Sequence, residues 1–404
     1  MRDSGPFKTK TGFRHYRHHL YVLSSGILLT LIFPLPGIQS FSWIALVPLI
    51  IASVEAEKPS RSFFYGYSCG LLWSLGALHW TYIYHPLSIY PVVLITSIYP
   101  GLFALLINRI TSRMGSFSLF FSVPVIWTSL EYLRSLGFLG FTWNSLGYAQ
   151  FRNIPLIQLS AFTGVFGITF LICMVNGAVA AAIKNTWDAK KCLLTISTGL
   201  IIPAAVFLIG HACLRRCSPR DDEKIKVAGI QGSFNHDMLW SGFSHEIIRL
   251  LDNLTHEAGE QSPSLIVFPE STIGEDMHSI FEFNLWPKDI ICQMARSTGS
   301  YLVIGAPYRE GGKNYNSVYL VSPGCEIIGR YDKIKLVPGG EYFPRFGHKP
   351  FIRRLLAGAG GYTPGREMAV FEIPDARFSV LVCFEGIFGD LARRFVKKGE
   401  SDIC

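Results

Sequence analysis

The 404-residue sequence contains few charged residues. Aspartate, glutamate, lysine and arginine make up 16% of it, whereas an ordinary soluble domain has about 25%. Hydrophobic residues make up 49%, and the mean hydropathy is +0.31, so the chain is neither disordered nor fibrous. A single soluble globule would not carry this much apolar sequence, and the length allows two or more domains.

Acidic residues are particularly scarce in the first half. Residues 1–215 contain 15 lysines and arginines but 5 aspartates and glutamates, whereas residues 216–404 contain 22 and 24. The net charge of +8 therefore comes from the apolar half. A nucleic-acid-binding domain would gather its cations on a soluble face, whereas basic residues between apolar runs are typical of a membrane protein.

Metal-binding motifs and internal repeats are also missing. The nine cysteines form no CxxC pair and no zinc-binding spacing with histidine, so we expect no metal site. Cys213 and Cys217 are close enough in sequence to pair. A disulfide between them is one hypothesis, and the alternative is that the cysteines act as small buried hydrophobic residues.

Seven apolar runs alternate with polar loops in the first half. A membrane-spanning helix needs about 20 mostly apolar residues. We therefore predict a polytopic membrane domain of about seven helices over residues 20–215, after a basic cytoplasmic segment of residues 1–19. The long basic lead and the missing small-residue cleavage site argue against a signal peptide. The runs cover residues 20–35, 41–54, 63–80, 89–107, 117–133, 162–183 and 193–212.

The basic residues between these runs predict an orientation. Twelve of them precede the first run or lie in alternate loops after it, whereas the opposite short loops carry only Arg134 and Arg152. The positive-inside rule puts the N-terminus in the cytoplasm and residue 216 onward on the outer side. The twelve are Arg2, Lys8, Lys10, Arg14, Arg17, Lys58, Arg61, Arg109, Arg113, Lys184, Lys190 and Lys191.

One acidic residue, Glu131, lies inside an apolar run. It is three residues before Arg134, and such positions are neighbours on a helix. Two interpretations stay open: a structural ion pair between them, or a carboxylate that faces a substrate. The segment Gly140–Tyr148 mixes aromatic residues, glycine and one asparagine, which indicates an interfacial or re-entrant piece rather than a span.

From about residue 216, short apolar strands alternate with helix-like segments. This pattern favours an α/β domain in which helices cover a sheet. We expect helices near residues 243–259, 286–297 and 391–398. The expected strands are Lys226–Ile230, Leu265–Phe268, Tyr301–Ile304, Ser317–Val321 and Phe378–Val382.

Reactive side chains follow two of these strands. Glu270 comes after the second strand, and Cys383 after the last. A cysteine thiolate attacks acyl carbons, and a thiol needs a nearby base at neutral pH, for which Glu270 is the candidate. Lys333 and Lys335 share a strand face, so periodicity does not choose which one stabilises an oxyanion. Taken singly, such a cysteine packs in a core and such a glutamate is a solvated loop acid.

These segments resemble the nitrilase superfamily, in which a glutamate, a lysine and a cysteine act together on a four-layer αββα sandwich. With apolar runs in front, they are similar to its membrane-bound branch, the apolipoprotein N-acyltransferases of the bacterial inner membrane. The segments that carry the resemblance are Glu131–Arg134, Phe141–Tyr148, Gln231–Gly232, Trp240, Phe268–Glu270, Tyr331–Lys333, Leu336–Tyr342 and Cys383–Glu385.

The resemblance implies roles for particular residues. Glu270 is the general base, Lys333 rather than Lys335 is the oxyanion lysine, and Cys383 is the acylated nucleophile. The supporting residues it implies are Glu341, a second glutamate; Phe384 and Glu385, an aromatic–acid pair after the nucleophile; and Trp240, near the substrate entrance.

The resemblance also implies a reaction. A phospholipid acyl donor would acylate the cysteine and release lysophospholipid, and the chain would pass to the α-amino group of the diacylglyceryl-cysteine of an apolipoprotein. Such an enzyme uses no cofactor and no nucleic acid. It is expected to be a monomer in the bacterial inner membrane, with its catalytic domain in the periplasm.

The end of the chain leaves other functions open. It stops 21 residues after Cys383, where a further strand is expected, so the catalytic domain of residues 216–404 is expected to be truncated and its sandwich incomplete. The alternatives are a membrane-tethered nitrilase-type amidase, with water as acyl acceptor, and an inactive fragment.

Overall fold

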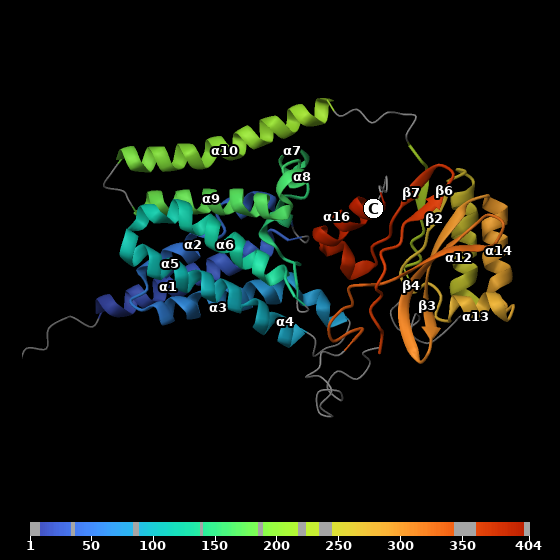
Figure 1. Cartoon of the computed structure of the whole chain (residues 1–404). Coiled ribbons are helices and arrows are strands. Elements are labelled where there is room, and N and C mark those ends of the chain that lie inside the picture. The colour runs from blue at the N-terminus through green and yellow to red at the C-terminus, as the bar shows by residue number, and fades with distance from the viewer. Residues whose placement is uncertain are drawn as a thin grey trace, which may run out of the picture. The chain divides into compact units, whose positions relative to one another are not determined.

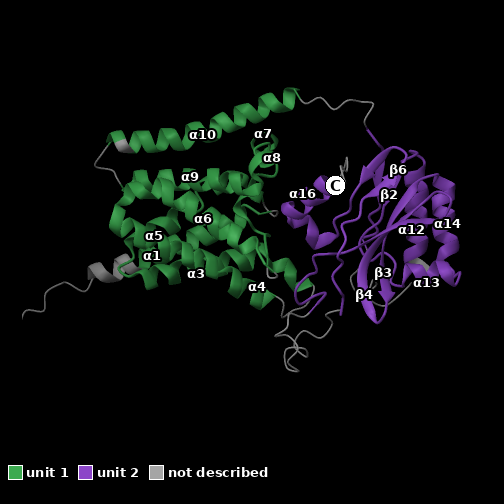
Figure 2. Cartoon of the chain, viewed as in Figure 1, with its two compact units in different colours: residues 1–218 green, residues 219–404 purple. Residues whose placement is uncertain are grey.

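A computed structural model describes residues 9–33, 37–83, 89–137, 140–184, 189–216, 224–233, 245–342 and 361–399. The chain forms two compact units, residues 1–218 and residues 219–404 (Figures 1 and 2). Trp240 and Cys217 lie outside the described residues, so the substrate-entrance role of Trp240 and the pairing of Cys213 with Cys217 stay predictions.

Unit 1, residues 1–218, is helical in its described part (Figure 1). Its glycines allow close helix packing: a Cβ atom at Gly66 of α3 would collide with the carbonyl oxygen of Pro100 in α5. The helices are α1 (Thr9–Leu31), α2 (Val47–Glu55), α3 (Pro59–Ala77), α4 (Ile89–Thr96), α5 (Ile98–Met114), α6 (Leu119–Ser135), α7 (Ile154–Ile157), α8 (Ser160–Thr163), α9 (Val165–Lys184) and α10 (Ala189–Arg216).

Three helices in the described part of the chain are long and apolar enough to cross a membrane: Ile89–Met114, Val165–Lys184 and Cys192–Arg216. Gln39–Glu55 is apolar but shorter, so the count of about seven spans stays a prediction. Helix α1 already begins at Thr9, and the cytoplasmic placement of residues 1–19 stays a prediction. Residues 13–20 contain neither proline nor glycine, so nothing local interrupts this helix.

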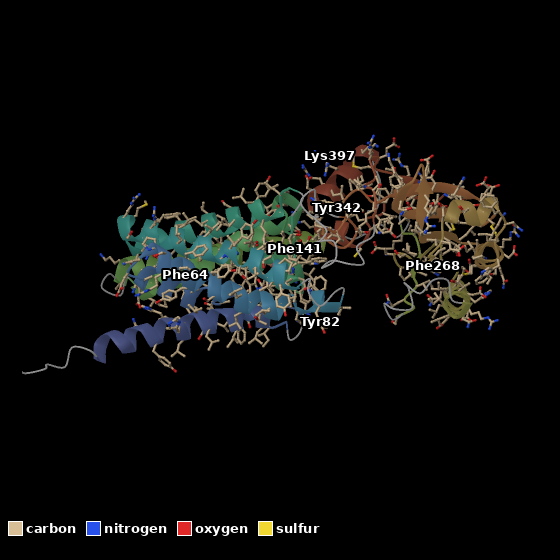
Figure 3. All side chains as sticks on the ribbon, turned by 90° about the horizontal axis from the view of Figure 1, so that it is seen from below. Phe64, Tyr82, Phe141, Phe268, Tyr342 and Lys397 are labelled. Carbon is tan, nitrogen blue, oxygen red and sulfur yellow. A yellow bond between two sulfur atoms is a disulfide. The ribbon has the colours of Figure 1, made fainter. Side chains whose placement is uncertain are left out.

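Apolar side chains cover much of the outside of unit 1. Phe64 and Tyr82 are 63% and 59% exposed (Figure 3), and α10 exposes Leu193, Ile201 and Leu208 along its length. Apolar surface of this extent marks a protein or membrane contact.

Inside unit 1, the buried carboxylate of Glu131 accepts three hydrogen bonds. The donors are Trp127 Nε1 at 2.9 Å, Leu146 N at 2.8 Å and Thr169 Oγ1 at 2.9 Å. Arg134, also buried, donates to Ser145 Oγ at 3.3 Å. No direct ion pair within 4.0 Å joins these two described side chains, although their opposite charges still interact. Neutral donors from three elements reach Glu131 instead.

The segment after α6 does not span, as the sequence predicts. Its described residues from Gly140 run as turns into the 3-10 helix η4 (Leu146–Gln150). The backbone bond from Leu146 to Glu131 and the bond from Gly147 N to Thr169 Oγ1 at 2.9 Å attach this segment to α6 and α9.

Unit 2, residues 219–404, contains a five-stranded sheet in the order β1-β2-β3-β4-β5 (Figure 1). Strands β1, β2 and β3 are parallel, whereas β4 runs antiparallel to both β3 and β5. The first four expected strands are confirmed, and β5 is an addition that the sequence did not reveal. The strands are β1 (Val227–Gly229), β2 (Leu265–Val267), β3 (Tyr301–Glu310), β4 (Lys313–Val321) and β5 (Ile327–Asp332).

Helices cover one face of this sheet. They are α12 (His245–Gly259), α13 (Met277–Glu282) and α14 (Pro287–Thr298), and α12 and α14 match two helices expected from the sequence. Leu302, Ile304 and Ala306 of β3 alternate toward this face and share a buried cluster with Ile291 and Met294 of α14. The layered α/β prediction is therefore confirmed for the described residues.

Segments near the end of the chain pack on Tyr331 and Gly329 of β5. The ring of Tyr331 meets that of Phe395 edge to face at 5.4 Å, and a Cβ at Gly329 would contact the ring of Phe371. These segments are the hairpin β6 (Phe371–Ile373) and β7 (Ala376–Phe378), the 3-10 helix η7 (Cys383–Ile387) and α16 (Gly389–Gly399), which confirms the last expected helix.

One expected strand is misplaced. The sequence predicts a strand over Phe378–Val382, but β7 ends at Phe378. Residues 379–382 are apolar enough for a strand, yet no described strand pairs with them, and a strand needs a partner for its backbone groups. The second sheet of an αββα sandwich therefore stays a prediction.

Candidate active site

The amino group of Lys333 lies between two carboxylates. Its Nζ atom is 3.0 Å from Oε1 of Glu270 and 3.0 Å from Oε1 of Glu341. Glu270 follows β2 and Lys333 follows β5, so the sheet brings together residues far apart in sequence. Lys333 is 1% exposed, and a buried ammonium needs such counter-charges.

Asn316 of β4 also joins the two carboxylates. Its Nδ2 atom donates to Glu270 Oε1 at 2.7 Å and to Glu341 Oε1 at 2.6 Å. Its backbone oxygen accepts from Lys333 N at 2.8 Å. Sequence reasoning missed this residue, because an asparagine within a strand gives no signal until the neighbouring strand is placed beside it.

A tight turn fixes Glu341. The backbone N–H of Val337 donates to Glu341 Oε2 at 2.7 Å, and Gly339 N donates to Tyr342 O at 2.9 Å. Gly339 has φ of +80°, which glycine adopts at no steric cost. The turn thus fixes the carboxylate that lies against Lys333.

Cys383 occupies a constrained turn close to these charges. Its φ of +46° is uncommon for a residue with a side chain and is typical of functional sites. The turn closes through Glu385 N, which donates to Val382 O at 3.0 Å, and Val382 N, which donates to Glu385 Oε2 at 2.9 Å. Phe384 is buried, with its ring 5.0 Å from that of Phe388.

The charges around Cys383 oppose one another. Cys383 keeps some solvent-accessible surface, but partial burial raises the pKa of its thiol to about 11. The negative charge of Glu270 adds to this rise, whereas the positive charge of Lys333 opposes it. Burial alone would lower the pKa of the Lys333 ammonium, but Glu270 and Glu341 raise it above its usual value. The thiol is therefore protonated at neutral pH, and Lys333 is charged.

Lys335 has a different environment. Its Nζ atom lies 3.9 Å from the centre of the Phe388 ring. Burial and the nearby Arg394 lower the pKa of its ammonium. The two lysines that periodicity could not separate are thus separated by the fold, because Lys333 alone of the two contacts Glu270 and Glu341.

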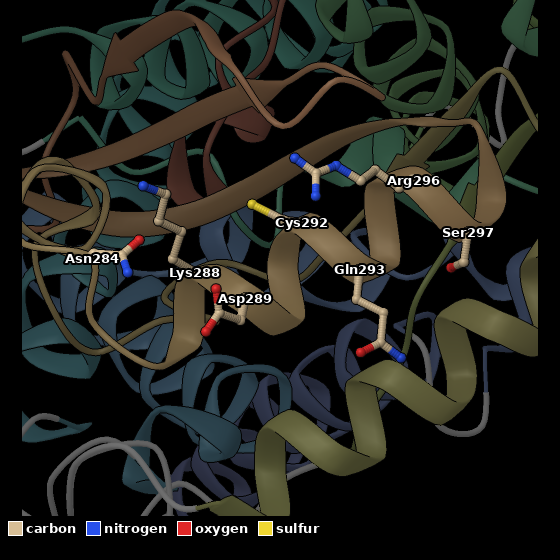
Figure 4. Close-up of a pocket in the computed structure, with 7 residues that line it drawn as sticks. All are labelled: Asn284, Lys288, Asp289, Cys292, Gln293, Arg296 and Ser297. Carbon is tan, nitrogen blue, oxygen red and sulfur yellow. The ribbon is translucent and has the colours of Figure 1, made fainter.

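A separate hollow lies on α14 and contains none of the predicted site residues. Figure 4 shows its lining on one side of the helix. Its Cys292 is bonded to Cys325 in the turn between β4 and β5, a disulfide that the sequence did not reveal. The lining residues are Asn284, Lys288, Asp289, Cys292, Gln293, Arg296 and Ser297.

Both units match known protein families. Residues 25–178 match the N-terminal domain of apolipoprotein N-acyltransferase, and residues 226–404 match carbon-nitrogen hydrolase. The apolipoprotein N-acyltransferase of Geobacter metallireducens is 35% identical over 403 residues, which cover 95% of this chain and 76% of that protein. The chain belongs to the apolipoprotein N-acyltransferase family.

The chain is also similar to a second apolipoprotein N-acyltransferase and, more remotely, to a solved amidase. The apolipoprotein N-acyltransferase of Nostoc sp. is 30% identical over an alignment that covers 87% of this chain and 73% of the Nostoc protein. The solved structure of an amidase from Nesterenkonia sp. is 19% identical, with a TM-score of 0.32. The match covers 45% of this chain and 63% of the amidase chain. The residues around Lys333 and Cys383 lie within the region matched to carbon-nitrogen hydrolase.

Proposed function

We propose that this member of the apolipoprotein N-acyltransferase family carries its chemistry on Cys383, Glu270 and Lys333. The observation that supports this most is the buried Lys333 ammonium, 3.0 Å from both Glu270 and Glu341, beside a thiol whose pKa both Glu270 and Lys333 affect. Acyl transfer needs a nucleophile, a base and an oxyanion partner. This cluster supplies one of each.

In the first step, Glu270 accepts the thiol proton as the Cys383 sulfur attacks an ester carbonyl carbon of a phospholipid. Lys333 stabilises the negative oxygen of the tetrahedral intermediate. The carbon–oxygen bond then breaks, and the lysophospholipid leaves as an alcohol that takes the proton from Glu270. The product is a thioester on Cys383.

In the second step, the α-amino group of a diacylglyceryl-cysteine attacks this thioester. An amide forms, the carbon–sulfur bond breaks, and the amine proton returns to the thiol through Glu270. Glu341 and Asn316 hold Lys333 and Glu270 in place. Glu385 holds the turn of Cys383, and Phe384 packs beneath that turn. Trp240 is proposed to line the substrate entrance, and the whole cycle needs no cofactor.

The membrane domain has a physical purpose in this proposal. Both substrates carry acyl chains, and drawing a chain into water costs about 0.8 kcal/mol per CH₂. We place residues 20–215 in the bacterial inner membrane as a polytopic domain and residues 216–404 in the periplasm as the αββα catalytic domain. The exposed apolar side chains of α10 and the basic cytoplasmic loops support this arrangement.

The test is formation of an acyl-enzyme. Protein incubated with phospholipid vesicles is expected to gain the mass of one acyl chain on Cys383, and Cys383→Ala is expected to gain none. Adding a diacylated lipopeptide should discharge the thioester into N-acylated peptide. If the thioester is hydrolysed to free fatty acid and no N-acylated peptide forms, the amidase hypothesis is supported instead. If the parent protein gains no mass, both the acyltransferase and the amidase hypotheses are contradicted.

A further inference from the structure

The carboxylate of Glu385 connects the lysine segment to the cysteine turn. It is completely buried. Its Oε1 atom accepts from the Tyr331 hydroxyl at 2.8 Å, Ile334 N at 2.8 Å and Lys335 N at 2.9 Å. Its Oε2 atom accepts from Val382 N at 2.9 Å. One oxygen therefore binds the segment around Lys333, and the other binds the turn that holds Cys383.

Among these donors, Tyr331 supplies the only side chain. It is 1% exposed, and burial together with the adjacent Glu385 carboxylate raises the pKa of its phenol. The hydroxyl therefore stays protonated and donates a hydrogen bond to Glu385. The same oxygen accepts from Ile334 N at 3.4 Å, so it contacts both the carboxylate and the backbone just after Lys333.

We propose that Tyr331 is a positioning residue, whose hydroxyl acts through Glu385 to set Cys383 relative to Lys333. The inference rests on the proposed function for its consequence in catalysis. Cys383 has φ of +46°, a conformation that persists only where its surroundings hold it. The two bonds between Glu385 and Val382 provide that hold, and the tyrosine fixes the carboxylate that makes one of them.

The variant that isolates the hydroxyl is Tyr331→Phe. The phenylalanine ring keeps the packing against Phe395 at 5.4 Å, and Glu385 Oε1 keeps its two backbone donors. The variant should therefore fold. Its matched control is Tyr319→Phe, because Tyr319 is an equally buried tyrosine of the neighbouring strand β4 whose hydroxyl has no hydrogen-bond partner in the described structure.

Two measurements test the proposal. The first is the single-turnover rate of thioester formation with phospholipid vesicles. Tyr331→Phe is expected to slow it about tenfold, since a small misplacement of reacting groups can cost up to about a hundredfold, whereas Tyr319→Phe should keep the parent rate. The second is the pH dependence of Cys383 alkylation by iodoacetamide, whose midpoint should move in Tyr331→Phe alone.

The outcomes separate this proposal from the one on which it rests. If the parent protein forms no thioester, the proposed function fails, while the alkylation midpoint still measures the link from Tyr331 to the thiol. The positioning role is overturned if Tyr331→Phe keeps both the parent rate and the parent midpoint. It is also overturned if its unfolding temperature falls far below that of Tyr319→Phe, which would make the hydroxyl purely structural.

Discussion

At the scale of single residues, charge placement distinguishes side chains that look alike in sequence. Lys333 and Lys335 are two positions apart, but the first lies between Glu270 and Glu341 and the second lies over Phe388. Periodicity cannot make this distinction, because both positions share a strand face. The resemblance to a known family selects Lys333, and its role as the oxyanion lysine stays a proposal.

The lysines give a direct prediction. Lys333→Ala is expected to lower the rate of thioester formation by about 10²–10³, the usual effect of losing one oxyanion donor. Lys335→Ala should stay within about threefold of the parent, as do most substitutions away from a site. Rates for both variants on phospholipid vesicles check this, and equal losses would contradict the assignment of Lys333.

The thiol gives a pH prediction. The pKa of Cys383 is raised to about 11, first by burial and then by Glu270, so alkylation by iodoacetamide should rise with pH up to about that value. Glu270→Gln removes a negative charge that disfavours the thiolate, and should move the alkylation midpoint to lower pH. Lys333→Met removes a cation that favours it, and should move the midpoint upward. Shifts in the opposite directions would refute the charge assignments.

At the scale of elements, a buried carboxylate in unit 1 and a disulfide in unit 2 attach segments to one another. In unit 1, Glu131 connects α6 to Leu146 at the start of η4 and to Thr169 of α9. In unit 2, the bond between Cys292 and Cys325 connects α14 to the turn between β4 and β5. Neither connection is visible in the sequence, because each depends on elements that approach only in the folded chain.

Removing Glu131 should destabilise unit 1. Glu131→Ala leaves three buried donors without an acceptor, and each such group costs about 1–3 kcal/mol, so a loss of about 3 kcal/mol or more is expected. The control is Glu57→Ala, whose exposed i,i+4 pair with Arg61 contributes about 0.5 kcal/mol or less. Thermal unfolding in detergent compares the two variants, and similar unfolding temperatures would contradict the role given to Glu131.

Removing the disulfide should destabilise unit 2. The two cysteines are 33 residues apart, and a bridge closing a loop of this length contributes about 3–4 kcal/mol. Cys292→Ser should lower the unfolding temperature, a reducing agent should do the same to the parent, and Cys192→Ser should change little because Cys192 is a free thiol. If the reducing agent lowers the unfolding temperature of Cys292→Ser as much as that of the parent, the stabilisation does not come from this bridge.

At the scale of the whole molecule, the chain joins a basic, apolar unit to a nearly neutral α/β unit. The charge asymmetry predicts that the first unit lies in the membrane with its N-terminus inside. The disulfide in the second unit is typical of an oxidising compartment, which supports the same orientation independently.

This orientation predicts a protease pattern. In spheroplasts, added protease should remove residues 219–404 and leave an N-terminally tagged membrane fragment, whereas inverted membrane vesicles should show the reverse protection. The same chain in detergent, where both sides are open, is the control. Loss of the N-terminal tag in intact spheroplasts would show that the positive-inside reading is wrong for this chain.

The two-part organisation, most strands of the sheet and the reactive residue types could be predicted from the amino-acid sequence. Those features follow from local composition and periodicity, which the chain carries along its length. The folded structure was needed to show that Lys333 meets Glu270 and Glu341, that Asn316 bonds both of these carboxylates, that Tyr331 bonds Glu385, and that Cys383 does not end a paired strand. Each of these depends on which strands become neighbours, because hydrogen bonds and charges act over a few ångströms in space whatever the distance along the chain.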